Sequence, residues 1–297
     1  MTVFTGSGVA IVTPFVENTH EIDYRSFQTL LDFHLDHGTD AIIVAGTTGE
    51  SSTMTDEEQV DLIKFTVDHI DGRIPVIAGA GINDTRHAIR LSQQAENAGA
   101  DALLILTPYY NKANHEGLLR HYRAIADSVD IPIIMYEVPG RTGMAMTVDE
   151  VVELSEHPNI VGLKDATGNM EFTRAVLERT DDDFAVYSGN DDLNHEIMTL
   201  GGKGVISVTA NVLPDEVHEL CQLHLDGNGQ DAAVIDQQLE GINRDLFVEV
   251  NPIPVKYLVH KMGYCSLDYR LPLYEPSDEA KKVLDGYLTT LAKNNRD

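Results

Sequence analysis

The chain of 297 residues carries 48 Asp and Glu against 21 Lys and Arg, a formal net charge of −27 at pH 7. Such an excess repels phosphate groups, so it argues against nucleic acid and anionic membrane surfaces as partners and is typical of a surface adapted to solubility or to salt. No apolar run is long enough to span a membrane, the N-terminus lacks the basic region of a secretory signal, and Cys221 and Cys265 form no metal or disulfide pattern, so we expect a cytoplasmic protein.

Short apolar runs recur along the chain at intervals of about 20 to 34 residues. Each is rich in β-branched residues and nearly continuous in apolarity, which is typical of strands buried on both faces of a parallel sheet. The eight predicted strands cover residues 9–14, 41–49, 75–81, 102–110, 132–141, 160–168, 184–191 and 204–211.

The intervals between these runs predict amphipathic helices. Residues 22–37 place apolar side chains three or four positions apart, as a helix with one buried face does. Thr55 followed by Glu58 matches a capping box at the start of the next helix. Gly38 and Gly99 stand where helices should end, shortly before the next strand.

Eight strand–helix units predict an α/β fold of the (β/α)8 TIM-barrel type over residues 1–225. A doubly wound sheet is the competing fold, but residues 79–84 (GAGIND) lack the third glycine of the dinucleotide fingerprint. Residues 226–297 show helical patterns and no strand pattern. We expect them to form a C-terminal helical domain that packs on the barrel and is structural rather than catalytic.

Polar side chains follow the predicted strands at the end where TIM barrels build their active sites. The loop 46–51 (GTTGES) follows the second strand, and Tyr110 ends the fourth. Tyr136 lies in the fifth strand with Arg141 close behind it, and Lys164 ends the sixth. These residues should therefore meet at one mouth of the barrel.

Lys164 has two interpretations. A strand-end lysine beside Asp165 is more often a salt-bridged or snorkelling residue. In an apolar mouth, however, burial disfavours the ammonium form, and a neutral amine can attack a keto group to form a Schiff base. Tyr136 and Tyr110, linked by the hydroxyl of Thr47, would then move protons, although each also fits a structural role as a core, interface or turn residue.

Two features of the mouth suit carboxylates. The small-residue loop with Thr47 and Thr48 lets backbone amides and hydroxyls approach an anion closely. The fork-shaped guanidinium of Arg141 suits a second carboxylate. Metal binding is not expected, because His34 and His37 lie on a helical stripe with no third ligand in the pattern.

Six motifs resemble the dihydrodipicolinate synthase (4-hydroxy-tetrahydrodipicolinate synthase) family, in the superfamily of N-acetylneuraminate lyase, and the resemblance covers nearly the whole chain, from FTGSGVAIVTPF (4–15) to YRLPL (269–273). The motifs are GTTGES, TPYYN, YEVPGRTG, GLKDATGN, GVISVTAN and NPIPVK. The resemblance implies a lyase that condenses pyruvate with L-aspartate 4-semialdehyde, the committing step of lysine and diaminopimelate synthesis. It implies no metal or organic cofactor, because the lysine itself supplies the electron sink.

The resemblance also implies a role for each candidate catalytic residue. Lys164 would form the Schiff base with pyruvate, and Tyr136 would act as general acid and base. Thr47 would bridge Tyr136 to Tyr110, which in this family reaches in from the neighbouring subunit. A homodimer or a homotetramer (a dimer of dimers) is therefore expected.

Four further residues would bind substrates. Thr48 would hold the carboxylate of pyruvate, and Arg141 would hold that of the semialdehyde. Gly189 and Ile206 would complete the site, Ile206 through its backbone carbonyl near bound pyruvate. Thr48 and Arg141 are similar to the synthases, since sialic acid lyases typically have Ser at the position of Thr48 and no arginine at the position of Arg141.

The sequence departs from the family pattern in two places. Glu137 stands where the family usually has Asn, and it could either pair with Arg141 or lie outside the substrate path. Asp56, Gln59 and His87 occupy positions where lysine-regulated members carry other residues. We therefore predict that lysine inhibits this enzyme weakly or not at all.

Two alternatives to the synthase activity stay open at this point. One is another pyruvate-dependent aldolase of the same superfamily, with a sugar-acid or hydroxy-keto-acid substrate. The other is a catalytically silent barrel that binds an acidic metabolite.

Overall fold

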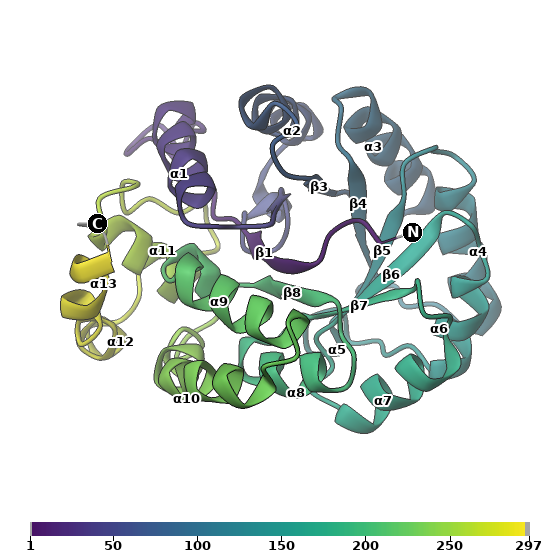
Figure 1. Cartoon of the computed structure of the whole chain (residues 1–297). Helices are drawn as coiled ribbons and strands as arrows, with labels where there is room; N and C mark the ends of the chain where they lie inside the picture. Colours follow the sequence, from purple (N-terminus) through teal and green to yellow (C-terminus); the bar gives the residue numbers. More distant parts are fainter. Residues whose placement is uncertain (1, 295–297) are drawn as a thin grey trace.

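The computed structural model describes residues 2–294, in which one closed parallel sheet is surrounded by helices (Figure 1). Eight strands follow one another around the barrel in chain order, and the last pairs with the first. This topology confirms the predicted (β/α)8 barrel, and closure leaves no unpaired sheet edge. The strands are β1 (Gly6–Ala10), β2 (Ala41–Val44), β3 (Val76–Gly79), β4 (Ala102–Leu106), β5 (Ile133–Glu137), β6 (Ile160–Asp165), β7 (Ala185–Ser188) and β8 (Gly204–Ser207).

Helices cover the outside of the barrel, and further helices follow it on the side where the chain ends (Figure 1). Within residues 2–294, none of them is long and apolar enough to cross a membrane. The α-helices are α1 (Tyr24–Asp36), α2 (Asp56–Ile70), α3 (Thr85–Asn97), α4 (His115–Ala126), α5 (Pro139–Thr142), α6 (Val148–Ser155), α7 (Met170–Arg179), α8 (Asn194–Thr199), α9 (Pro214–Leu225), α10 (Gly229–Asp245), α11 (Ile253–Lys261), α12 (Asp278–Asp285) and α13 (Leu288–Asn294). Three short 3-10 helices are η1 (Ser51–Thr53), η2 (Asp191–Leu193) and η3 (Thr209–Asn211).

The strands are shorter than the apolar runs, and the first is displaced. β1 begins at Gly6, three residues before the predicted start at residue 9. The predicted fifth strand runs through Arg141, but Pro139 opens helix α5 instead, because its fixed φ suits the first turn of a helix and it has no N–H for a strand ladder. The apolar residues beyond the strand ends belong to the loops that build the mouth.

The predicted helix signals are confirmed. The side chain of Thr55 accepts a hydrogen bond from the backbone N–H of Glu58, and the Glu58 carboxylate accepts one from the N–H of Thr55, which completes the capping box of α2. Gly38 and Gly99 follow α1 and α3 with φ of +72° and +94°, a region that favours glycine. These caps fix where each helix ends and the next strand enters the barrel.

Two groups of apolar side chains form the core. The larger lies between the barrel and its helices, and the smaller fills the barrel interior, where Ile43, Ile77 and Ile206 are buried. At the amino ends of the strands, the ring of Tyr187 stacks on Phe4, with centroids 4.5 Å apart, and its hydroxyl donates to the Phe4 carbonyl. That contact fixes the segment before β1 against the interior of the barrel.

The boundary between barrel and appendage was predicted at residue 225. Helix α9 ends at Leu225, and only helices and loops follow it in the described part of the chain. Helix α10 packs against α8 and α9, and α11 packs against α12. Residues 295–297 of the expected helical domain lie outside the described residues, and the division into two domains stays a prediction.

Candidate active site

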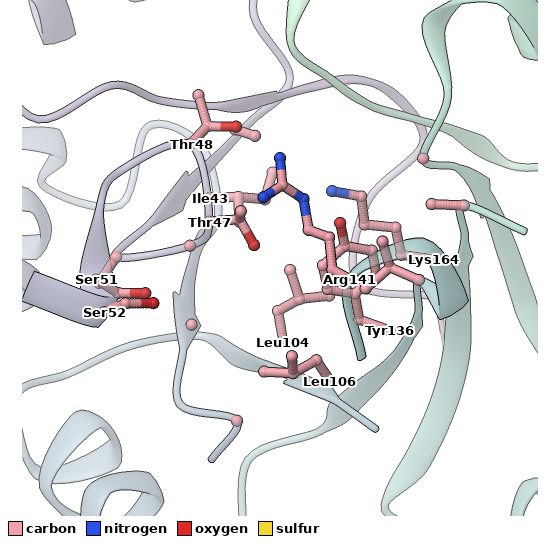
Figure 2. Close-up of a pocket in the computed structure, with 18 of the residues that line it drawn as sticks. Ile43, Thr47, Thr48, Ser51, Ser52, Leu104, Leu106, Tyr136, Arg141 and Lys164 are labelled. Carbon is pink, nitrogen blue, oxygen red and sulfur yellow. The ribbon is translucent and has the colours of Figure 1, made fainter. Parts of the chain in front are cut away.

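One pocket opens at the carboxyl ends of the strands, where the sequence places its polar residues (Figure 2). Its floor is apolar and comes from barrel strands, including Ile43 of β2 and Leu104 of β4. Six of the eight predicted site residues line it: Thr47, Thr48, Tyr136, Arg141, Lys164 and Gly189. The sequence therefore located the pocket correctly.

Lys164 reaches the floor of this pocket from β6. It is 5% exposed, and its Nζ lies 4.2 Å from the centre of the Tyr136 ring. Among residues 2–294, no carboxylate lies within ion-pair distance of it. Its neighbour Asp165 points to the opposite face, as successive strand residues do, and accepts hydrogen bonds from Thr167 and Thr173. Lys164 therefore forms no salt bridge with Asp165, and its amine faces the pocket.

Gly189, after β7, makes room for this lysine. A Cβ atom at position 189 would lie 3.0 Å from Cε of Lys164 and 2.9 Å from Cβ of Ala166. Both distances are shorter than ordinary contacts between carbon atoms. The absence of a side chain at 189 thus allows the lysine to extend toward the pocket.

The loop after β2 brings Thr47 and Thr48 to the rim. The N–H of Glu50 donates to the Thr47 carbonyl over 3.1 Å, which closes a tight turn. Thr48 is buried, and its Oγ1 accepts a hydrogen bond from Nδ2 of Asn251 over 3.0 Å. The loop therefore presents hydroxyls from a fixed backbone.

Arg141 lies in the short helix α5, and its guanidinium projects over the pocket toward Lys164 and Thr47 (Figure 2). Nη2 donates to the backbone carbonyl of Asn251 over 2.8 Å. That bond uses one of several donors, so other N–H groups remain for an anion. Arg141 thus brings a cation to the rim of the pocket.

Two predicted site residues do not line the pocket. Tyr110 is 90% exposed and has a positive φ of 67°, so its side chain points away from the pocket of its own chain. Ile206 is fully buried in the barrel interior, below the pocket. Val208, the first residue after β8, lines the pocket instead.

Glu137 does not pair with Arg141. It alternates with Tyr136 on β5, points away from the pocket and is fully buried, with its carboxylate accepting a hydrogen bond from the Met146 N–H over 3.0 Å. Burial, helped by the charge of nearby Asp165, raises the pKa of Glu137 to about 7. Of the two interpretations of this residue, the structure supports the one outside the substrate path.

Two of the pocket residues that the sequence did not predict come from the segment after α10. Phe247 and Asn251 line the pocket, although the C-terminal region was expected to be structural. The Oδ1 atom of Asn251 is buried and has no hydrogen-bond partner among the described residues. The motif NPIPVK, which contains Asn251, was the available signal.

Two further polar residues, His34 and Asp191, have structural roles that their contacts explain. His34 is fully buried against Thr39, and burial lowers its pKa to about 3, as fits a neutral core histidine. Within residues 2–294, no group of three or more His, Cys, Asp or Glu could hold a metal ion. Asp191 accepts hydrogen bonds from the N–H groups of Val208 and Thr209, and so braces the loop after β8.

The pocket extends sideways to η1, α2 and α3, and we call this part of it the side wing. Asp56, Gln59 and His87 line this wing. The Asp56 carboxylate contacts Nε2 of His87 at 2.8 Å and Nη2 of Arg90 at 2.9 Å. Burial of Asp56 opposes ionisation, but the hydrogen bonds from Arg90 and His87 outweigh it and hold the pKa of Asp56 below the usual range, so Arg90 already matches its negative charge.

Comparison with known proteins gives consistent matches over the whole chain. The model of the dihydrodipicolinate synthetase family matches residues 3–291. A 4-hydroxy-tetrahydrodipicolinate synthase of Thermoanaerobacter sp. (strain X514) is 49% identical over 290 residues, which cover 97% of each chain.

Solved structures agree with these matches. Dihydrodipicolinate synthase from Aquifex aeolicus superposes with a TM-score of 0.95 at 45% identity, over 97% of this chain and 98% of that one. The chloride-inhibited enzyme from Acinetobacter baumannii, complexed with pyruvate, has a TM-score of 0.95 at 43% identity, over 98% and 99% of the two chains. On sequence, fold and pocket alike, the chain belongs to the dihydrodipicolinate synthetase family.

Proposed function

We propose that this chain condenses pyruvate with L-aspartate 4-semialdehyde, the reaction of a 4-hydroxy-tetrahydrodipicolinate synthase in lysine and diaminopimelate synthesis. The observation that carries the proposal is Lys164: a lysine at the apolar floor of the pocket, beside a tyrosine and without a carboxylate partner among the described residues. The names of the relatives support the same reaction.

The chemistry begins at the amine of Lys164. Nζ adds to the keto carbon of pyruvate, and loss of water gives a Schiff base. Removal of a proton from the methyl carbon then gives an enamine, because the protonated imine accepts the electron pair. The enamine carbon bonds to the aldehyde carbon of the semialdehyde, whose oxygen takes up a proton. Attack of the semialdehyde amine on the imine carbon closes the ring and releases Lys164.

Tyr136 is the nearest group for these proton transfers. Its ring lies against Nζ of Lys164, and it lines the pocket together with Thr47. We assign Tyr136 as general acid and base and Thr47 as the hydroxyl that connects it to Tyr110. The exposed side chain of Tyr110 supports a role in a neighbouring subunit, so we propose a homodimer or a dimer of dimers as the active form.

The substrates each bring a carboxylate. We assign the carboxylate of pyruvate to Thr48 and that of the semialdehyde to Arg141, since both residues line the pocket and Arg141 offers free donors. Gly189 leaves space beside Lys164, and the backbone of Ile206 would lie below the bound keto acid. No organic cofactor or metal takes part in the proposed steps.

The buried, unpaired Cys221 and Cys265 fit a reducing compartment, and we place the protein in the cytoplasm.

A coupled assay tests the reaction. It contains pyruvate, the semialdehyde, NADPH and the next reductase of the pathway, with wild type, Lys164→Ala and the control Lys64→Ala, whose side chain is exposed on α2. We expect NADPH oxidation with wild type and the control only. Borohydride with pyruvate should add mass to wild type at Lys164. An adduct without turnover would mean another acceptor substrate, and the lack of an adduct would contradict the mechanism.

A further inference from the structure

A buried ion pair joins the C-terminal region to the substrate loop. Nζ of Lys256, in α11, lies 2.5 Å from Oε1 of Glu50, the residue that follows Gly49 in the loop after β2. Both side chains are 0% exposed. The two residues are 206 positions apart, so the pair can form only in the folded chain.

The surroundings of the pair are apolar and closely fitted. Nζ of Lys256 lies 4.1 Å from the ring centre of Phe15 and 5.1 Å from that of Tyr269. The second carboxylate oxygen of Glu50 faces the N–H of Arg270 at 3.4 Å. Burial raises the pKa of Glu50 and lowers that of Lys256, so each charge depends on the other.

Glu50 holds the loop in an unusual backbone conformation. Its φ of +59° is in the left-handed region, which disfavours side chains. Its N–H closes the turn on the Thr47 carbonyl, and its carbonyl accepts from the N–H and the hydroxyl of Thr53. Such a conformation persists only where surrounding contacts enforce it.

The same C-terminal region holds the loop at two other points. Asn251 donates to Thr48, and Arg270 donates to the Thr53 carbonyl and to Glu58 at the start of α2. The loop is therefore fixed from one side by a single segment, with the Glu50–Lys256 pair at the centre.

We propose that the Glu50–Lys256 pair is a positioning pair, which holds Thr47 and Thr48 where they bind the carboxylate of pyruvate and connect to Tyr136. The proposal rests on the proposed function, because it concerns the same pocket. Neither Glu50 nor Lys256 lines the pocket, so the pair acts through the loop and contacts no substrate.

The alternative is that the pair only stabilises the fold, and a set of variants separates the two. Glu50→Gln and Lys256→Met each leave one buried group unmatched, whereas the double variant removes both charges and should recover stability. Leu284→Ala, in α12 of the same region, opens a cavity at a buried residue that does not line the pocket and serves as the control for a loss of stability alone.

The measurements are the unfolding midpoint, KM for pyruvate and kcat. We expect both single variants to lower the midpoint and to raise KM for pyruvate by about tenfold or more, with a smaller change in kcat. The double variant should regain the midpoint and keep the raised KM. Leu284→Ala should lower the midpoint with an unchanged KM.

Two results would overturn the proposal: a double variant that regains both midpoint and KM, or a Leu284→Ala variant whose KM rises as much as that of Glu50→Gln. Both results depend on KM values, so they can be obtained only if the wild-type protein is active. If wild type itself forms no pyruvate adduct under borohydride, the proposed function fails, and the role of the pair in pyruvate binding fails with it.

Discussion

Tyr136 and Lys164 are paired across neighbouring strands β5 and β6, and the amine of the lysine lies 4.2 Å from the centre of the tyrosine ring. This register brings an amine and a phenol together on rigid elements rather than on loops. Because strand residues alternate, it also sends Glu137 and Asp165 to the opposite face, away from the substrate.

Tyr136→Phe should separate binding from chemistry. The ring against Lys164 is kept, whereas the hydroxyl that moves protons is lost. We expect kcat to fall by about 10²- to 10⁴-fold, while borohydride still traps pyruvate on Lys164. Steady-state kinetics and intact-mass analysis measure the two effects. A variant with the kcat of wild type would exclude Tyr136 as the acid and base.

Gly189→Ala should act on the lysine. The added methyl group would meet Cε of Lys164 at 3.0 Å, which displaces the amine and costs about 1–3 kcal/mol of overpacking. We expect slower adduct formation with pyruvate. Gly229→Ala is the matched control, because its new Cβ would meet atoms no nearer than 3.8 Å. Equal rates for the two variants would show that position 189 tolerates a side chain.

Glu137 should make stability depend on pH. The pKa of Glu137 is raised from 4.5 to about 7 in the folded chain. The contribution of the protonated side chain to the free energy of unfolding is therefore complete below about pH 4.5 and is lost as the pH rises through about 7. Glu137→Gln keeps the acceptor for the Met146 N–H and cannot ionise. We expect the variant to be more stable than wild type at pH 8, by at most about 3 kcal/mol, and similar at low pH.

Denaturant unfolding of wild type and Glu137→Gln at several pH values from 4.5 to 8 measures this difference. Comparing the two proteins removes the contribution of other titrating groups, such as the buried His34 and His121. If the free energies of unfolding of the two proteins changed with pH in parallel, ionisation of Glu137 would carry no cost in the folded chain.

Free lysine should inhibit the enzyme weakly or not at all. In the side wing, the carboxylate of Asp56 is already matched by His87 and Arg90, so an incoming ammonium group finds no free anion there. Rates measured at increasing lysine concentration should stay constant through the sub-millimolar range. Inhibition in that range would sink this prediction.

Salt should stabilise the protein. The formal charge of −27 makes the surface repel itself, and added ions screen that repulsion. We expect the unfolding midpoint to rise with sodium chloride concentration and activity to persist at moderate salt. Activity that collapses there would count against a salt-adapted surface.

Local patterns were sufficient to predict the barrel and to bring Thr47, Thr48, Tyr136, Arg141 and Lys164 to its mouth. Buried strands of a parallel sheet are continuous apolar runs, and the polar residues at their ends meet because the barrel closes. The start of β1 at Gly6 was missed because its first three residues are Gly, Ser and Gly, which do not continue the apolar run. Helix α5 was missed because it has only four residues.

The contacts that complete the site could not be predicted in this way. Asn251 meets Thr48 across 203 positions, and Lys256 meets Glu50 across 206, so no local pattern encodes either contact. An acidic residue at 137 gave no sign of which face it takes until the register with β6 was known.

The hydrogen bonds that Asn251 donates to Thr48 and accepts from Arg141 also bear on how the site is assembled during synthesis. A nascent chain made as far as β8 already contains Lys164, Tyr136 and both threonines, but the residue that fixes the rim has not yet been translated. The contacts that fix Thr48 and Arg141 in the folded chain therefore cannot form before residue 251 has emerged from the ribosome.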